Sequence, residues 1–194
     1  MKKIIITIFI IIILDVIFVR SSNTNKINND YYNLCKIELI NEVDSYIKKF
    51  APKSKMTGTN IVNLCLTYDF DIPLALSQFH IESHFASYGV AKRTNNVANV
   101  GNMDDGTILY KFNHPDKSVE PYIKLMLNDY LNNKSVDELL NNFVNLHNKR
   151  YASDINYESK VKFKRNYIIK NTNILKLQNT INNLKISNKY ELER

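Results

Sequence analysis

Turn-forming residues are scarce in this chain, which has four glycines and four prolines in 194 residues. A β-sandwich or a β-barrel needs a turn roughly every 8–12 residues, and glycine and proline supply many of those turns. The length is sufficient for one domain with a buried core but short for two. We therefore expect a single domain that is mainly α-helical.

Apolar residues recur at helical spacing along most of the chain. The expected helices cover residues 31–50, 60–68, 72–85, 118–131, 136–146 and 157–169. The third has a clear start signal, because Asp71 precedes Pro73, and Ser118 is expected to cap the fourth. Residues 107–112 alternate like a short strand before a polar turn at 113–116, which predicts one small β-hairpin.

The N-terminus has the pattern of an export signal. Lys2 and Lys3 precede an apolar run at residues 4–19 that is interrupted by Thr7 and Asp15, and this run is short for a membrane span of about 20 apolar residues. We interpret residues 1–21 as a signal peptide cleaved after Ser21, or as an uncleaved signal anchor. Residues 22–30 form a polar linker. The protein is then secreted or held at the cell envelope, with membrane attachment possible through residues 4–19.

The formal net charge of +7 favours anionic partners such as nucleic acid, lipid head groups or wall polymers. No segment combines basic and aromatic residues in the manner of a nucleic-acid recognition motif. The charge is therefore a weak signal, and we expect no nucleic-acid partner.

Cysteine and histidine spacing gives no sign of a metal site. Cys35 and Cys65 leave two alternatives open: one disulfide closing a long loop in an exported domain, or two buried thiols on separate helices. His80 and His84 lie four residues apart, which is also a metal-ligand spacing, but the intervening residues differ from the zinc-protease pattern and no third ligand is evident. We expect no metal and no other cofactor.

Residues 72–85 carry the leading candidate for chemistry. Gln78 and Glu82 lie four residues apart, on or near the apolar face of the expected helix. Ile81 and Phe85 flank Glu82, and the resulting desolvation raises the pKa of a carboxyl group, as a general acid near neutral pH requires. Helical spacing alone favours the alternative, a glutamate that faces solvent in the last turn.

The segment Pro73-Leu-Ala-Leu-Ser-Gln78 followed by Ile81-Glu-Ser-His-Phe85, with the later pair Asn95-Asn96 and the triplet Asn99-Val100-Gly101, resembles a known signature. It is similar to that of the peptidoglycan endo-β-N-acetylglucosaminidases, glycoside hydrolase family 73. The segment from Tyr151 through Ala152, Ser153 and Asp154 to Tyr157 resembles a second motif of this family. The chain departs from the family pattern at positions beside the site: His84, Phe85, Ala86 and Asn102.

The resemblance spans roughly residues 60–169 and implies a lysozyme-like α+β domain with the hairpin beside a cleft. We place this domain at residues 31–177 and expect a polar tail at 178–194 from its composition. It implies hydrolysis of β-1,4 bonds in peptidoglycan glycan strands, with Glu82 as the general acid that protonates the leaving oxygen. The candidates for a second catalytic group are Asp105 and Asp104, with Asp116 behind them. The candidate substrate-binding residues are Tyr151, Gln78, Asn96 and Tyr157, whereas Asp154 is expected to be structural.

Two other functions stay open. Lytic transglycosylases share the Glu-Ser-x-Phe pattern and the lysozyme-like fold, although their expected Gly-Leu-Met-Gln continuation is absent. The unusual His84 and Asn102 also leave room for a non-catalytic module that binds the wall or builds a virion. Whether the protein serves remodelling, lysis or entry does not follow from the residues.

Overall fold

The structure, a computed structural model, describes residues 28–101 and 106–192, and the side chains of these up to residue 187. The expected signal segment 1–21, most of the linker, and the candidate residues Asp104 and Asp105 lie outside the described residues. In the two described ranges, no helix is both long enough and apolar enough to cross a membrane.

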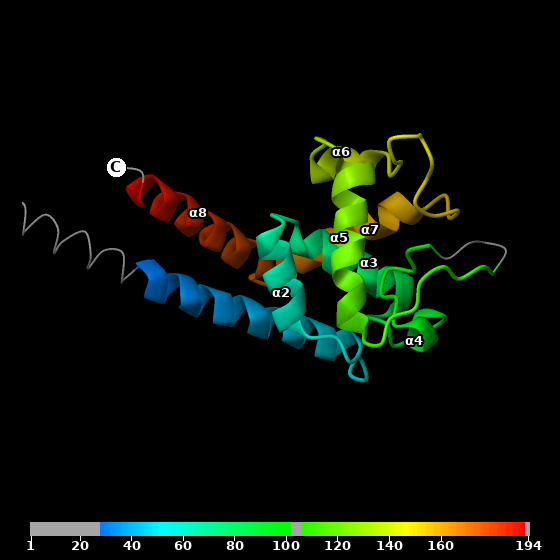
Figure 1. Cartoon of the computed structure of the whole chain (residues 1–194), viewed down its shortest axis with the longest axis horizontal. Coiled ribbons are helices and arrows are strands. Elements are labelled where there is room, and N and C mark those ends of the chain that lie inside the picture. Colours follow the sequence, from blue (N-terminus) through cyan, green and yellow to red (C-terminus); the bar gives the residue numbers. More distant parts are fainter. Residues whose placement is uncertain (1–27, 102–105, 193–194) are drawn as a thin grey trace, which may run out of the picture.

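Helices make up most of the described chain, which confirms the mainly α-helical fold (Figure 1). An N-terminal helix is described from residue 28 to 50. The later elements are α2 (Gly58–Thr67), α3 (Ile72–Ser83), α4 (Ala91–Thr94), the 3₁₀ helix η1 (Pro115–Ser118), α5 (Val119–Leu125), the π-helical η2 (Met126–Leu131), α6 (Val136–Asn141), α7 (Tyr157–Asn171) and α8 (Ile174–Leu192).

The described residues do not support the expected β-hairpin at residues 107–112. Among the described residues there is no strand ladder, and the antiparallel bridge between Val144 and Arg150 is an isolated one. The 107–112 segment instead makes single backbone hydrogen bonds, such as Leu109 N–H to the Gly101 oxygen at 3.2 Å. Its alternating side chains do not bury one face, since Leu109 and Tyr110 are both about half exposed.

Helix α3 is the central element and positions the site. Asp71 caps it by accepting a hydrogen bond from Leu74 N–H at 2.6 Å, with Pro73 in the first turn, as the sequence predicts. The side chain of Asp71 also pairs with Arg165 of α7 at 2.8 Å, and both side chains are largely buried. Helix α3 is buried from Ile72 to His80 because α7, α8 and α2 pack around it.

The boundaries of three helices differ from those expected. Helix α2 begins two residues earlier than expected, and Thr57 caps it. Gly58 allows the start of α2 to lie close to the N-terminal helix, because a Cβ at this position would be 2.7 Å from the Ile40 oxygen. Helix α6 ends at Asn141, because the next residue is extended. The Ser118 side chain makes no capping hydrogen bond to α5. Its hydroxyl instead accepts a hydrogen bond from Val97 N–H at 3.0 Å.

The expected polar tail from residue 178 is helical, because α8 runs without a break to Leu192. Gln178 is buried, accepting a hydrogen bond from Ile72 N–H at 3.0 Å and donating to the Phe70 oxygen at 2.8 Å. Ile181 is also fully buried. The polar composition of this segment gives no sign that it packs against the core. Gln178 can be buried because its side-chain amide forms hydrogen bonds with buried backbone groups.

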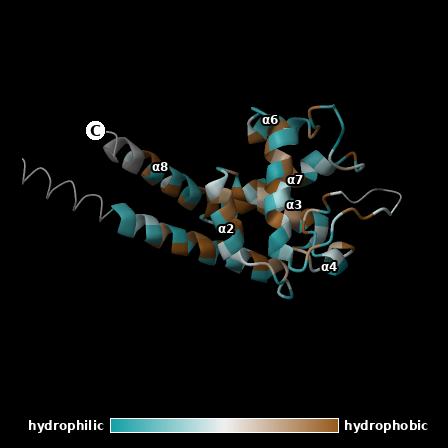
Figure 2. Ribbon diagram, viewed as in Figure 1, coloured by the Kyte–Doolittle hydropathy of each residue, from teal (hydrophilic) through white to brown (hydrophobic). Residues whose placement is uncertain are grey.

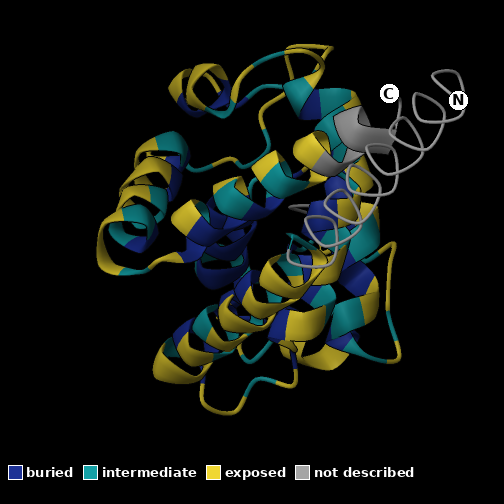
Figure 3. Ribbon diagram, turned by 90° about the vertical axis from the view of Figure 1, so that its left-hand side faces the viewer, coloured by how far each residue is buried: buried dark blue, intermediate teal, exposed yellow. Residues whose placement is uncertain are grey.

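The hydrophobic core lies where the helices meet. Figure 2 shows apolar residues concentrated on the inward faces of the helices, and Figure 3 shows the same faces buried. Cys35 on the N-terminal helix and Cys65 on α2 both belong to this core as free thiols. Of the two alternatives for the cysteines, the structure therefore has buried thiols rather than a disulfide.

Candidate active site

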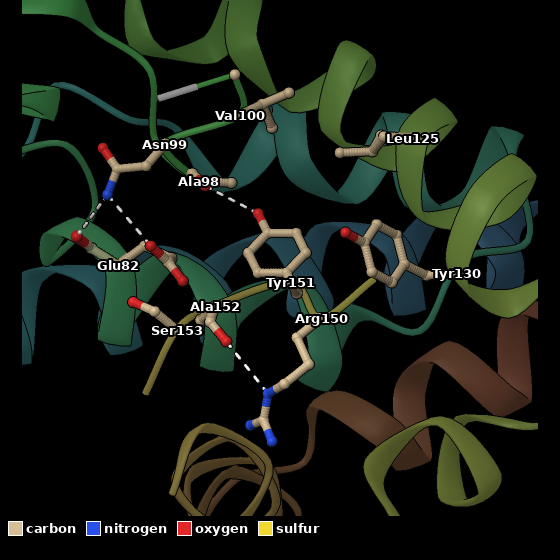
Figure 4. A pocket seen from close by; sticks show the side chains of 11 residues that line it. Glu82, Ala98, Asn99, Val100, Leu125, Tyr130, Arg150, Tyr151, Ala152 and Ser153 are labelled. Carbon is tan, nitrogen blue, oxygen red and sulfur yellow. Dashed lines mark hydrogen bonds between the residues drawn. The ribbon is translucent and has the colours of Figure 1, made fainter. Parts of the chain in front are cut away.

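A pocket of about 540 Å³ lies at the C-terminal end of α3 (Figure 4). Glu82 from the last turn of α3 lines it, together with the loop 98–101, Leu125 of α5, Tyr130 of η2, and residues 150–153 before α7. Within the described part of the chain, Glu82 is the only acidic residue on its wall. The pocket thus combines one carboxyl group with aromatic and backbone surfaces.

Burial raises the pKa of Glu82 above its ordinary value, and hydrogen bonds from Tyr157 and Asn99 partly oppose this rise. The Asn99 amide donates to Glu82 Oε2 at 3.2 Å and to the Glu82 main-chain oxygen at 3.0 Å. Figure 4 shows this amide directed at Glu82 beside the ring of Tyr151. Because desolvation dominates, Glu82 keeps its proton to higher pH than an exposed glutamate, as a general acid requires.

Two of the expected substrate-binding residues lie behind Glu82 rather than in the pocket. Gln78 and Tyr157 are both buried, and Gln78 Nε2 donates to the Tyr157 hydroxyl at 2.9 Å. On the other side of Gln78, the Tyr122 hydroxyl donates to Gln78 Oε1 at 2.5 Å. Sequence reasoning missed Tyr122, because nothing in the spacing of α5 and α3 shows that the two helices bring these side chains together.

Tyr151, in contrast, lines the pocket as the motif predicts. Its ring stacks on that of Tyr157 with centroids 5.5 Å apart, and lies 5.3 Å from the ring of Tyr130. Its hydroxyl donates to the Ala98 oxygen at 2.8 Å. Since that proton is already engaged, Tyr151 offers a bound sugar mainly the apolar surface of its ring.

Asn96, the fourth expected substrate contact, is fully buried and does not line the pocket. Its amide donates to the Val100 oxygen at 2.7 Å and its oxygen accepts from Val100 N–H at 3.1 Å. These two bonds close the loop so that Asn99, at a φ of 52°, reaches Glu82. Asn99 belongs to the recognised motif but was not among the predicted site residues, although asparagine is one of the few residue types that tolerate such a backbone.

The turn after Glu82 has an unusual backbone. His84, Phe85 and Ala86 all have positive φ, at 47°, 57° and 57°, a conformation that costs free energy in residues other than glycine. The Ser83 hydroxyl stabilises the turn by donating to the Val97 oxygen at 2.6 Å and accepting from Ala86 N–H at 2.8 Å. Three positions that depart from the family pattern therefore coincide with a strained turn.

Of the three other candidate acids, the structure describes only Asp116, which does not line the pocket of Glu82. Asp104 and Asp105 lie outside the described residues. Asp116 accepts hydrogen bonds from the Thr57 N–H at 3.0 Å and the Thr57 hydroxyl at 2.8 Å, so it joins η1 to the start of α2. Asp154 accepts from Asn156 N–H at 2.9 Å just before α7, which confirms the structural role expected for it.

His80 is an enclosed, neutral histidine on the face of α3 away from the pocket. Its ring lies 4.9 Å from that of Phe50, and the Tyr46 hydroxyl is 3.3 Å from its Nδ1. Burial, and next the nearby charge of Lys164, lowers the pKa of His80 to about 4. In the described ranges, no three His, Cys, Asp or Glu side chains come close enough to hold a metal ion.

A carboxyl group with a raised pKa, placed in an aromatic-walled pocket, is typical of enzymes that cleave glycosidic bonds by proton donation. The family model described as mannosyl-glycoprotein endo-beta-N-acetylglucosaminidase matches residues 58–170. The chain belongs to this glucosaminidase family. At the level of the family it is therefore a glycoside hydrolase that acts on peptidoglycan. No curated protein gives a significant match to the chain.

Proposed function

We propose that this protein hydrolyses the β-1,4 bond that follows N-acetylglucosamine in peptidoglycan glycan strands, with Glu82 as the general acid. One observation supports this most strongly: Glu82, with its raised pKa, is the only acidic residue that lines the pocket in the described part of the chain. Family membership gives the substrate class.

The neighbours of Glu82 determine where its proton lies. The Asn99 Nδ2 group that bonds Glu82 Oε2 can only donate, and the Tyr157 hydroxyl accepts from Gln78, which leaves its own proton for Glu82. In our proposal the carboxyl group of Glu82 carries its proton on the side that faces the pocket, which Glu82 lines. This proton passes to the glycosidic oxygen as the carbon–oxygen bond breaks, and the bonding electron pair stays with that oxygen.

Water then adds to the sugar carbon and loses a proton to a second group. Asp104 and Asp105 are our candidates for this group, because they follow Gly101, which lines the pocket, by three and four residues. Four residues of chain reach at most about 14 Å. We expect one of the separate variants Asp104→Asn and Asp105→Asn to lower kcat more than it raises KM. Wild-type rates in both would leave the N-acetyl oxygen of the substrate as the candidate.

Mass spectrometry of digested peptidoglycan tests the proposal. Fragments that end in reducing N-acetylglucosamine, absent with Glu82→Gln, are the expected result. Fragments with 1,6-anhydro ends would instead identify a lytic transglycosylase, which shares part of the motif. No fragments from the wild-type protein would favour a wall-binding or virion module.

We also propose that residues 1–21 direct export, because peptidoglycan lies outside the cytoplasm and Lys2 and Lys3 precede an apolar run. A fusion of residues 1–30 to a reporter should leave the cytoplasm. Sequencing of the mature N-terminus should begin near Ser22. A membrane-bound product that keeps Met1 would show an anchor, and a reporter retained in the cytoplasm would contradict export.

A further inference from the structure

Three buried polar side chains form a line that ends at Glu82 and starts outside the pocket. Tyr122 of α5, Gln78 of α3 and Tyr157 of α7 are each almost completely inaccessible to solvent, and none of them lines the pocket. The line runs from the Tyr122 hydroxyl to Gln78 and from Gln78 to the Tyr157 hydroxyl, whose interaction with the Glu82 carboxyl group lowers the pKa of Glu82. Three helices that are distant in sequence thus meet behind one carboxyl group.

The amide of Gln78 gives this line a direction, because one end only accepts hydrogen bonds and the other only donates them. Among the described residues, Gln78 Oε1 is the only acceptor that the Tyr122 hydroxyl contacts. Tyr122 therefore holds the oxygen of Gln78 toward itself and turns Nε2 toward Tyr157. In the reverse arrangement, the buried proton of Tyr122 would lose its acceptor, which is costly.

The same direction decides what Tyr157 does. Its oxygen accepts from Gln78 Nε2, so its own proton is available for Glu82. With the amide reversed, the Tyr157 hydroxyl would donate to Gln78 Oε1 and turn away from the carboxyl group. Tyr122, which lies on the far side of Gln78 from the pocket, determines which of these two arrangements forms.

We propose that Tyr122 and Gln78 are positioning residues, which fix the Tyr157 hydroxyl as a hydrogen-bond donor to Glu82. This inference rests on the proposed role of Glu82 as general acid. It assigns a function at the site to two side chains that do not line the pocket.

The consequence is measurable at Glu82. The hydrogen bond from Tyr157 favours the carboxylate and so lowers the pKa of Glu82, against the larger rise caused by burial. The other ionisable groups around Glu82 are Tyr151 beside Tyr157, Tyr122 from α5, and Arg150 on the pocket wall. Loss of the donated bond should therefore raise the pKa of Glu82 further.

Carbon-13 NMR titration of the Glu82 carboxyl, assigned by the resonance lost in Glu82→Gln, is the test. We expect Tyr122→Phe to raise the pKa of Glu82 by roughly one pH unit, the size expected for one hydrogen bond to a charged group. Tyr157→Phe should raise it as much, and the double variant no further. Tyr46→Phe, which removes another buried hydroxyl that contacts His80 and does not line the pocket, should leave it unchanged.

An unchanged pKa of Glu82 in Tyr122→Phe overturns the inference. If that variant does not fold, Gln78→Glu replaces it, because a carboxylate accepts from both tyrosines and turns the Tyr157 hydroxyl away. The effect of the added charge alone is measured in the Tyr157→Phe background. Equal shifts from Gln78→Glu in the two backgrounds would also overturn the inference.

Activity separates this inference from the proposed function. In an active enzyme, the alkaline limb of kcat/KM should move to higher pH in Tyr122→Phe, since Glu82 must be protonated to donate. A wild-type protein that does not hydrolyse peptidoglycan would contradict the proposed function. The titration of Glu82 would still decide whether Tyr122 positions the Tyr157 hydroxyl.

Discussion

His80 and Glu82 lie two residues apart on α3 but have different surroundings. Both are driven toward their neutral forms by burial, which lowers the pKa of His80 to about 4 and raises that of Glu82. His80 is enclosed by aromatic rings on one side of the helix. Glu82 opens into a pocket on another side and receives hydrogen bonds from Asn99 and Tyr157.

The difference shows that a perturbed pKa by itself does not identify a catalytic group. What separates the two residues is access to a pocket and a set of donors that stabilise the charged form. Distant segments supply both: the loop 96–101 brings Asn99, and α7 brings Tyr157. The comparison therefore predicts that changes at Glu82 alter catalysis and that changes at His80 alter stability.

The largest expected effect is that of Glu82→Gln. The variant keeps the shape of the side chain and removes the proton, so peptidoglycan hydrolysis should fall about 10²–10⁴-fold or more. The melting temperature should not fall, because the variant also removes a desolvated carboxyl group. Turbidity loss of wall suspensions and thermal melts measure the two effects. The control variant is His84→Gln, which changes an exposed residue. Hydrolysis retained by Glu82→Gln would contradict the assignment of Glu82 as the general acid.

A smaller effect, on stability alone, is expected at His80. Its folded-state pKa of about 4 lies below the ordinary 6.5, so the unfolded state binds more protons between these values. The stability that this pKa shift contributes is complete above about pH 6.5 and is lost as the pH falls toward 4. The loss should be about 1–2 kcal/mol, less than the full shift implies, because solvent screens the partly exposed ring. Urea unfolding at pH 7 and pH 4.5 should show this loss.

The variant His80→Gln should lack that part of the pH dependence, whereas His84→Gln should keep most of it, because His84 is the smallest of the three causes that lower the pKa of His80. The alkaline limb of kcat/KM should not move in His80→Gln. If that limb moved with His80, the two sides of α3 would not be separate as described, and His80 would take part in catalysis.

Asn99→Gly should act on the Glu82 side with a moderate effect. Glycine keeps the positive φ of this position and removes the amide that donates to Glu82 Oε2. Since that bond lowers the pKa of Glu82, its loss should raise the pKa, and the alkaline limb of kcat/KM should move up by at most about one pH unit. A limb that stays in place would show that the bond does not stabilise the carboxylate.

The smallest effect is expected for Tyr151→Phe. The hydroxyl bonds the Ala98 oxygen, so its removal should cost about 1 kcal/mol of stability and leave the ring surface in the pocket. We expect KM for soluble glycan fragments to change by no more than about threefold, because the ring still contacts the sugar. A tenfold rise in KM would show that the hydroxyl itself binds substrate.

The sequence predicted the features that depend on local pattern. Helix α3 and its Asp71 cap follow from adjacent residues, and the desolvation of Glu82 follows from its apolar neighbours. The family motifs indicated Tyr151, which lines the pocket.

Features that depend on packing between distant segments could not be predicted from the sequence. Tyr122 reaches Gln78 only because α5 packs behind α3. The burial of Gln178 and the helical course of α8 depend on backbone groups at Phe70 and Ile72. The hairpin is not supported by the described residues, and alternation indicates a strand only where a partner strand exists. The N-terminal helix and the whole of α8 lie outside the matched family range of 58–170.

The most direct test of proton donation by Glu82 compares two leaving groups. Glu82→Gln and the wild-type enzyme would be assayed on an N-acetylglucosamine oligosaccharide with a natural sugar leaving group, and on its 2,4-dinitrophenyl glycoside. Dinitrophenolate departs without a proton, so a missing general acid matters little for it. The account predicts a loss of about 10²–10⁴-fold on the sugar leaving group and of less than about tenfold on the dinitrophenyl glycoside. Equal losses on both substrates would contradict it, because Glu82 would then do something other than protonate the leaving oxygen.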